Sequence, residues 1–219
     1  QVGHARPGQA GATDLIGEWR KGVRLWHASC VVPPIYHSRE PSMPQPASKL
    51  PLGADLRVLA IAGVAGQSLS AGRWPLIRGV ADDRLQALLA AAGFDGTFMA
   101  GASAPEATPG GDEFADLLEL LREELALPDE SGNCLCHAIA TAAMGENHLW
   151  QDMGLPDRGA LSELLRANFP GLAARNIGDM KWKKFFYRQL CERAGVPICK
   201  APHCAECCDR ALCFGPEEG

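Results

Sequence analysis

Apolar residues recur at helical spacing along most of the chain from residue 55 onward. The clearest case starts at Asp112, and Pro128 ends it, because proline cannot donate the backbone hydrogen bond that a helix interior needs. Its apolar stripe consists of Phe114, Leu117, Leu118, Leu121 and Leu125. No stretch shows the alternation of apolar and polar residues that is typical of a half-buried strand. The pattern therefore predicts an all-α fold.

Further helices are expected where an apolar run meets a capping or ending signal. The run after Asp55 fits a buried strand as well as a buried helix, and its length, its alanine content and Asp55 as an N-cap favour the helix. The last helix should run from about Asp179 to Ala194 and end at Gly195, which best accepts a left-handed cap. The other expected helices are one capped by Asp82 or Asp83, one over Asn133–Met144 and one over Arg158–Asn168.

Two helical segments show a faint internal repeat. Gly79-Val-Ala-Asp82 aligns with Gly154-Leu-Pro-Asp157, and the same offset pairs Phe94 with Phe169. Such a repeat is typical of two related helical hairpins packed in a small bundle. Chance similarity between two helices rich in leucine and alanine explains the same pairs equally well.

The first fifty residues lack this periodicity and carry many prolines. We expect a poorly ordered N-terminal segment, 1–50, followed by a helical domain, 51–219, that ends in an irregular cysteine-rich loop over 196–219. Cys30 and His37 lie in the first segment. We interpret them as loop residues rather than as a pair of metal ligands.

Composition narrows the possible functions. Apolar residues make up 47% of the chain and the net charge is −5, so a broad basic surface for nucleic acid is not expected. No run approaches the ~20 apolar residues of a membrane span, and no secretory signal is visible at the N-terminus. Nine cysteines without such a signal indicate the reducing cytoplasm, where clustered thiols bind metal more often than they form disulfides.

Four cysteines near the C-terminus form the frame C-x4-C-x2-C-x5-C, built from Cys199, Cys204, Cys207 and Cys213. No helix or strand period places all four on one buried face, so packing does not explain them. Thiolates that converge from a loop suit a soft metal or an iron–sulfur cluster, and local disulfides are the alternative. The first three repeat the spacing of plant-type ferredoxins, whereas structural zinc sites usually pair two knuckles. The spacing thus favours an iron–sulfur cluster over zinc.

Other thiols and histidines near the frame are weaker candidates. Cys208 competes with Cys207 for the third position, since adjacent cysteines point in different directions. His203 lies inside the loop, where it is a possible metal ligand. Cys191 lies on the preceding helix, and we interpret it as a buried thiol.

Further upstream, Cys134 and Cys136 diverge by about 200° on a helix, so we interpret them as packing residues. His148 and Asp152 are spaced to form an oriented histidine–carboxylate pair. His148 is therefore either a ligand or proton donor near the metal, or a buried histidine after an N-cap at Asn147.

The last predicted helix has two faces. Trp182, Phe186 and Leu190 recur at four-residue spacing and are expected in the core. The opposite face carries Lys181, Lys184 and Arg188. That face is either simply solvated or attracts an anionic cluster, an oxyanion or an acidic partner.

Three runs of the sequence resemble the NifQ family, which supplies molybdenum for the iron–molybdenum cofactor of nitrogenase. They are Asn147–Leu155, Asp179–Gly195 and the closing run Cys213–Glu218, and the resemblance weakens before about Leu50. The cysteine frame is the family's signature and all four of its positions are filled, which selects Cys207 over Cys208.

The resemblance implies a cluster of iron, sulfide and molybdenum, with molybdate as the source, and a donor role rather than an enzymatic one. Its implied partners are the scaffold and reductase proteins of nitrogenase cofactor assembly, in the cytoplasm. Two other functions stay open: a ferredoxin-like electron-transfer module and a zinc-stabilised interaction protein.

Overall fold

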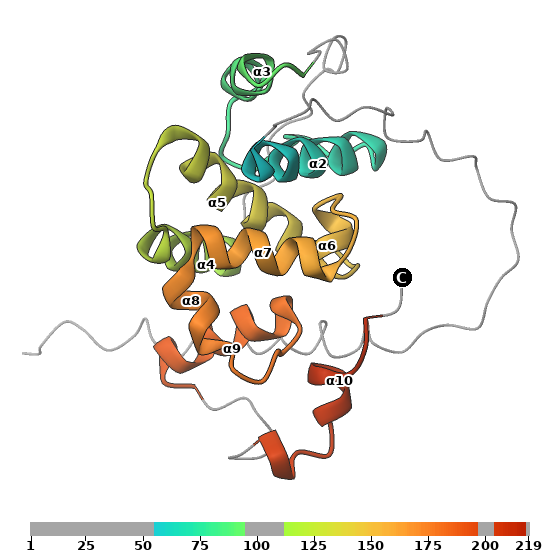
Figure 1. The fold of residues 1–219 in the computed structure, drawn as a ribbon, viewed down its shortest axis with the longest axis vertical. Coiled ribbons are helices and arrows are strands. Elements are labelled where there is room, and N and C mark those ends of the chain that lie inside the picture. Colours follow the sequence, from blue (N-terminus) through green and yellow to red (C-terminus); the bar gives the residue numbers. More distant parts are fainter. Residues whose placement is uncertain (1–54, 95–111, 197–203, 218–219) are drawn as a thin grey trace, which may run out of the picture. The chain divides into compact units, whose positions relative to one another are not determined.

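The residues that flank each apolar run determine where the helices begin and end. The structure is a computed structural model, and it describes residues 55–94, 112–196 and 204–217 (Figure 1). Asp55, Asp129 and Asp157 each precede a helix, and each side chain accepts a hydrogen bond from a backbone N–H of the first turn. Gly195 ends the last long helix with a φ of 65°, the left-handed conformation that glycine accepts most easily.

The described part of the chain is helical and contains no β-strand, which confirms the all-α prediction. The helices are α2 (Leu56–Ser70), α3 (Asp82–Ala91), α4 (Asp112–Glu124), α5 (Glu130–Ala143), α6 (Leu149–Asp152), α7 (Arg158–Asn168), α8 (Pro170–Arg175), α9 (Trp182–Ala194) and α10 (Arg210–Phe214), with a 3₁₀ turn at Cys204–Glu206.

Three expected helix starts were wrong by a few residues. Ala81 is the N-cap of α3, so Asp82 and Asp83 lie in its first turn instead, where their charges complement the helix dipole. Helix α5 begins at Glu130 because Asp129 caps it, ahead of the predicted start. Helix α9 begins after Asp179, which has a φ of 54° and therefore cannot be part of the helix.

Helix α5 forms the centre of the fold, and helices α2 and α4 pack against it (Figure 1). Buried residues occupy every side of α5, as expected for a helix with neighbours all round: Cys134, Leu135, Cys136, Ala138, Ile139, Ala140, Ala142 and Ala143. Helix α2 also approaches α6 closely at Gly63, where a β-carbon would collide with the backbone of Met153. This core holds α6, α7 and α9 in place.

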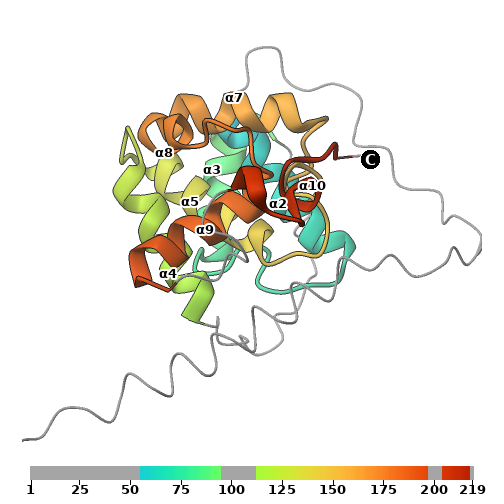
Figure 2. The ribbon, with the colours of Figure 1, turned by 90° about the horizontal axis from the view of Figure 1, so that it is seen from below.

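Helix α9 is the support for the C-terminal segment. Its predicted apolar stripe is buried, and the rings of Trp182, Phe185 and Phe186 lie within 6.3 Å of one another. The indole Nε1 of Trp182 donates to Ser162 Oγ of α7 over 3.1 Å, and Tyr187 donates to Glu113 of α4 over 2.9 Å. Seen from below, α9 lies across the body with α4 at one end and α10 near the other (Figure 2).

Several predictions concern residues outside the described ranges: the N-terminal segment 1–50 with Cys30 and His37, and the candidate ligands Cys199 and His203.

The possible internal repeat has one structural parallel, since Gly79 and Gly154 both have positive φ and each precedes a helix by a few residues. The relation between two hairpins stays a prediction. Within the described ranges, no helix combines the length and the apolar character that crossing a membrane would require.

Candidate functional site

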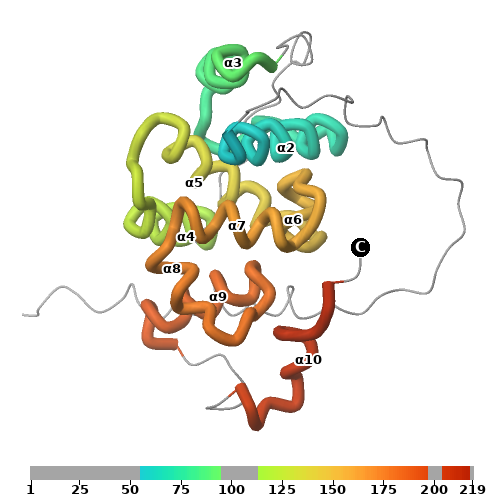
Figure 3. The backbone as a smooth tube through the Cα atoms, in the orientation of Figure 1, coloured from blue at the N-terminus to red at the C-terminus, as the bar shows by residue number. Residues whose placement is uncertain are grey.

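The cysteine segment, residues 204–217, is more regular than the irregular loop that the sequence predicted. It contains the 3₁₀ turn at Cys204–Glu206 and the short helix α10, which lies near one end of α9 (Figure 3). The backbone N–H of Lys181 donates to the carbonyl of Cys213 over 2.8 Å. The ring of Phe214 lies over Gly178, where a β-carbon would be only 3.0 Å from it. The segment is thus attached at the N-terminal end of α9.

The middle of α9 reaches the same segment through Arg188. Its guanidinium NH1 donates to Cys204 Sγ over 3.2 Å, while Nε donates to Glu192 over 2.7 Å. One side chain of the predicted basic face therefore contacts a candidate ligand. A guanidinium donor at this sulfur places a positive charge where an anionic ligand or cluster would bind.

The described cysteines fall into two groups by exposure. Cys134, Cys136 and Cys191 are buried, as expected for packing residues. Burial raises the pKa of Cys134 to about 11 and that of Cys136 to about 12, which disfavours the thiolate. The cysteines of the C-terminal segment are instead partly or fully exposed: Cys204, Cys207, Cys208 and Cys213. Only the second group suits metal binding from solvent.

The structure brings three predicted ligands into one short segment without closing a metal site. The amide of Cys207 donates to the carbonyl of Cys204 over 3.4 Å, so these two residues share one turn. Among the described residues, no three histidine, cysteine, aspartate or glutamate side chains gather as a metal site would require. Cys199 and His203 lie outside the described ranges.

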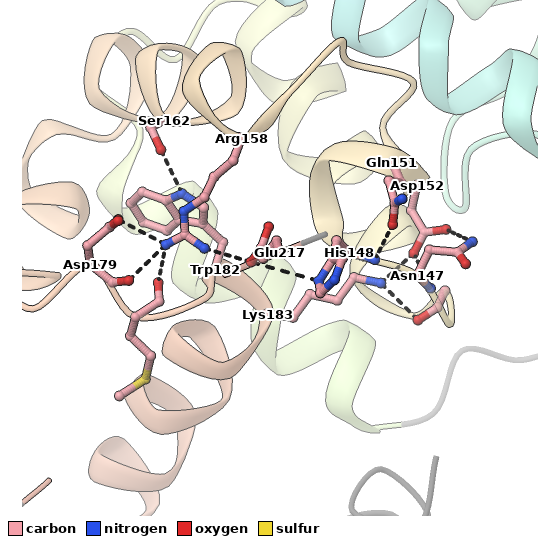
Figure 4. Close-up of polar contacts among 12 residues, drawn as sticks. Asn147, His148, Gln151, Asp152, Arg158, Ser162, Asp179, Trp182, Lys183 and Glu217 are labelled. Atoms are coloured by element: carbon pink, nitrogen blue, oxygen red, sulfur yellow. Dashed lines mark hydrogen bonds and ion pairs between the residues drawn. The ribbon is translucent and has the colours of Figure 1, made fainter. Parts of the chain in front are cut away.

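His148 lies beside the end of the cysteine segment, but not in the predicted arrangement (Figure 4). It is itself the N-cap of α6, in place of Asn147. Its Nδ1 is 3.8 Å from Glu217 Oε1, and Asp152 is engaged elsewhere. Burial lowers the pKa of His148, with the Glu217 carboxylate opposing that shift.

Asp152 is bound by Lys183 of α9 instead of by His148. Lys183 Nζ lies 2.5 Å from Asp152 Oδ2 and also donates to the carbonyl of Gly145 over 2.8 Å (Figure 4). Asn147 donates to both carboxylate oxygens of Asp152, through its backbone and side-chain nitrogens. Both charged side chains are buried, so this network ties the loop before α6 to α9.

A second ion pair, not predicted from the sequence, holds the C-terminal end of the segment. Arg158 NH1 donates to Glu217 Oε1 over 2.6 Å, and the Glu217 side chain is only 5% exposed (Figure 4). Glu217 belongs to the closing run that carries the family resemblance, which was the one available signal. No sequence signal indicated Arg158, because its role depends on a residue far away in the sequence.

The sequence matches a family profile described as NifQ over residues 59–215. It is 43% identical over 106 residues to Protein NifQ of Azotobacter vinelandii, covering 48% of this chain and 54% of that protein. It is 44% identical over 109 residues to a Protein NifQ homolog of Sinorhizobium fredii (50% and 47%), and 42% identical over 113 residues to Protein NifQ of Rhodobacter capsulatus (52% and 61%). The chain spans about half the length of these curated relatives. No solved structure matched it.

Proposed function

The chain belongs to the NifQ family, and on that premise we propose that it carries molybdenum, within an iron–sulfur cluster, for assembly of the iron–molybdenum cofactor of nitrogenase. The cluster is cargo rather than a resident cofactor. Its proposed ligands are the four cysteines of the frame: Cys199, Cys204, Cys207 and Cys213.

One observation supports this proposal most directly: the thiols of the C-terminal segment are accessible, whereas the cysteines of the helical body are buried. Thiolates bind soft metals and iron–sulfur clusters, and a thiol must lose its proton to do so. The raised pKa values of Cys134 and Cys136 make them poor ligands. The donor set of the segment therefore fits an iron–sulfur cargo in its chemistry.

The charge around the segment also fits an anionic cargo. A cluster held by four thiolates carries net negative charge, and Arg188 already lies 3.2 Å from the Cys204 sulfur. A guanidinium donor at that distance stabilises negative charge on sulfur and leaves the sulfur free to ligate. The basic face of α9 would likewise attract molybdate as the source of molybdenum.

We propose a carrier that acts by ligand exchange. Partly exposed cysteines hold a cluster where the thiolates of an acceptor protein can reach it, and each acceptor ligand that binds displaces one thiolate of this chain. Neither bond breaking in an organic substrate nor electron transfer is required. The proposed acceptors are the scaffold and reductase proteins of cofactor assembly, in the cytoplasm.

The deciding experiment is metal analysis of protein purified without oxygen, together with its visible absorption spectrum. Iron, sulfide and molybdenum in one chromophore support the proposal. Iron and sulfide without molybdenum, after growth with molybdate, indicate an electron-transfer module instead. Zinc with an empty visible spectrum indicates a zinc-stabilised interaction protein. Transfer of molybdenum from loaded protein to the assembly proteins then tests the donor role.

A further inference from the structure

The end of the cysteine segment is fastened to the body through one arginine. Arg158, at the start of α7, donates from NH1 to Glu217 Oε1 over 2.6 Å. From NH2 it donates to the carbonyl and the carboxylate of Asp179, over 2.8 and 2.9 Å, and to the carbonyl of Met180 over 3.1 Å. One guanidinium thus connects the loop before α9 with the chain end that follows Cys213 (Figure 4).

The loop that Arg158 binds is shaped to receive the segment. The side chain of Asn176 accepts from the N–H of Met180 and donates to its carbonyl, which closes the loop on itself. Asp179 has a left-handed φ of 54°, a conformation that costs energy for a residue other than glycine and needs support from its neighbours. Gly178 leaves room for the ring of Phe214. Arg158 contributes part of that support through the Asp179 carbonyl.

Cys213 is itself the first of two points at which the cysteine segment is attached to the helical body. Its own carbonyl accepts from Lys181 N–H over 2.8 Å, and Glu217, shortly after it, is held by Arg158. Phe214, the next residue, is placed between them by Gly178 and by the guanidinium of Arg210, 5.1 Å from the ring centroid. The backbone around the Cys213 thiol is therefore defined without any metal.

The burial of the pair indicates what it contributes. Glu217 is 5% exposed and Arg158 is 21% exposed, so both charges have lost most of their hydration. Such a pair adds little net stability compared with apolar side chains of the same size, because desolvation cancels much of the attraction. What a hydrogen-bonded ion pair does supply is a fixed orientation, and here the oriented element carries a candidate ligand.

We propose that Arg158 is a positioning residue for Cys213: together with Glu217 it holds the thiol in place before the cluster arrives. Arg158 does not touch the cargo and acts through the backbone that carries the cysteine. This inference rests on the proposed function in one respect, namely that Cys213 is a cluster ligand. Its structural part, the placement of Cys213, is testable without any metal.

The first test measures how fast each cysteine of the metal-free full-length chain reacts with iodoacetamide, followed peptide by peptide by mass spectrometry. In Arg158→Ala, we expect the alkylation rate of Cys213 to rise about fivefold. Loss of a charged hydrogen bond alone would allow a larger change in rate, but the Cys213 thiol is already partly accessible in the wild type. Cys208, which is exposed, should not change. Buried Cys134 should stay unreactive, which shows that the body has folded.

Two further variants separate positioning from general destabilisation. Glu217→Gln keeps the contacts of Arg158 with Asp179 and Met180, and it should also raise the alkylation rate of Cys213. Arg158→Lys should recover only part of the protection, because one ammonium cannot serve the carboxylate and both carbonyls in the geometry of the guanidinium fork. Arg84→Ala removes an exposed arginine paired with Glu130 and is the control that should leave Cys213 unchanged. Equal Cys213 rates in wild type, Arg158→Ala and Glu217→Gln would overturn the inference.

The second test reconstitutes the same proteins with ferrous iron and sulfide and measures bound iron. Arg158→Ala should lose its iron to a chelator faster than wild type does, and Cys213→Ala should show the same kind of loss. Iron retention identical to wild type would overturn the positioning role for ligation. A wild-type protein that binds no iron would instead overturn the proposed function, while the alkylation result would still decide whether Arg158 positions Cys213.

Discussion

The guanidinium of Arg188 lies 3.2 Å, NH1 to Sγ, from the thiol of Cys204. The two residues belong to different elements, the middle of α9 and the 3₁₀ turn that opens the cysteine segment. This contact places a permanent positive charge at the first described ligand of the proposed site. Helix α9, which is core on one face, thus presents a charged group to the proposed site from the other face.

We predict that Arg188→Ala weakens retention of the cluster. Loss of the N–H···S contact should shorten the half-life of bound iron against a chelator by about threefold to tenfold, since hydrogen bonds to charged groups are worth more than neutral ones. Arg193→Ala is a matched control: Arg193 lies on the same helix, is 41% exposed against 40% for Arg188, and also pairs with a glutamate. Equal half-lives in the two variants would contradict the role of Arg188.

The buried pair of Lys183 and Asp152 gives a prediction about stability. Burial lowers the pKa of Lys183, and Asp152 opposes that shift, so the ammonium depends on this carboxylate for its charge. Lys183→Met would leave Asp152 buried without its cation and should reduce the free energy of unfolding by about 3–5 kcal/mol. Urea unfolding of metal-free protein measures the effect.

The double variant Lys183→Met/Asp152→Leu tests the reason for that loss. If the cost comes from an unpaired buried charge, removing both charges should recover part of the stability, although Asn147 then loses its acceptor. A double variant no more stable than Lys183→Met alone would mean that the pair itself, and not the orphaned charge, supports the fold.

Local signals predicted some elements well. Helix α7 runs from Arg158 to Asn168 as expected, because Asp157 caps it and its leucines form one stripe. Helix α9 ends at Gly195 as expected, because this glycine adopts the left-handed conformation of a C-cap. These boundaries depend on residues that are neighbours in the sequence, so the sequence pattern contains the information.

Sequence patterns did not predict the contacts between residues that are far apart in the chain. The spacing of His148 and Asp152 suggested a pair, yet Lys183 binds Asp152, because a lysine buried at that position needs a carboxylate. The start of α9 was misplaced because the left-handed conformation of Asp179 is supported by Arg158, a residue on another helix. Tertiary contacts of this kind override local preference.

A third prediction concerns the loss of folding stability in acid and the part of His137 in it. Its Nδ1 lies 2.7 Å from the carbonyl of Arg78, which can only accept, so Nδ1 carries the proton and Nε2 accepts from Arg122 over 2.9 Å. A second proton on the ring would face the Arg122 guanidinium. Burial, together with Arg122 and Arg84, accordingly lowers the pKa of His137 below 6.5.

The direction of the pH effect follows from linkage. Between the lowered folded pKa and the unfolded value near 6.5, the unfolded chain binds more protons, so stability rises with pH. This contribution is fully present above the unfolded pKa and is lost as the pH falls through the folded pKa. Urea unfolding at pH 5 to 8 should therefore show declining stability below about 6.5, with a shallower decline in His137→Gln. Parallel curves for the two proteins would exclude His137 as the source.

A fourth prediction separates the cysteines of the frame from those of the core. Alanine at position 199, 204, 207 or 213 should sharply lower the iron bound after anaerobic reconstitution, since each removes a proposed ligand. Cys134→Ala should keep its iron, because Cys134 is buried in α5. A loss of iron in Cys134→Ala equal to that at the frame positions would place the site elsewhere in the chain.

The last prediction compares two adjacent thiols, Cys207 and Cys208. Cys207 is partly buried, and its amide donates to the carbonyl of Cys204, so it shares a turn with another proposed ligand. Cys208 is exposed, and its thiol donates to the carboxylate of its neighbour Asp209 over 3.8 Å rather than to the turn at Cys204. Cys208→Ser should therefore keep most of its iron and Cys207→Ser should lose it. Iron contents in the reverse order would show that Cys208 is the third ligand, and that the turn at Cys204 rearranges when the cluster binds.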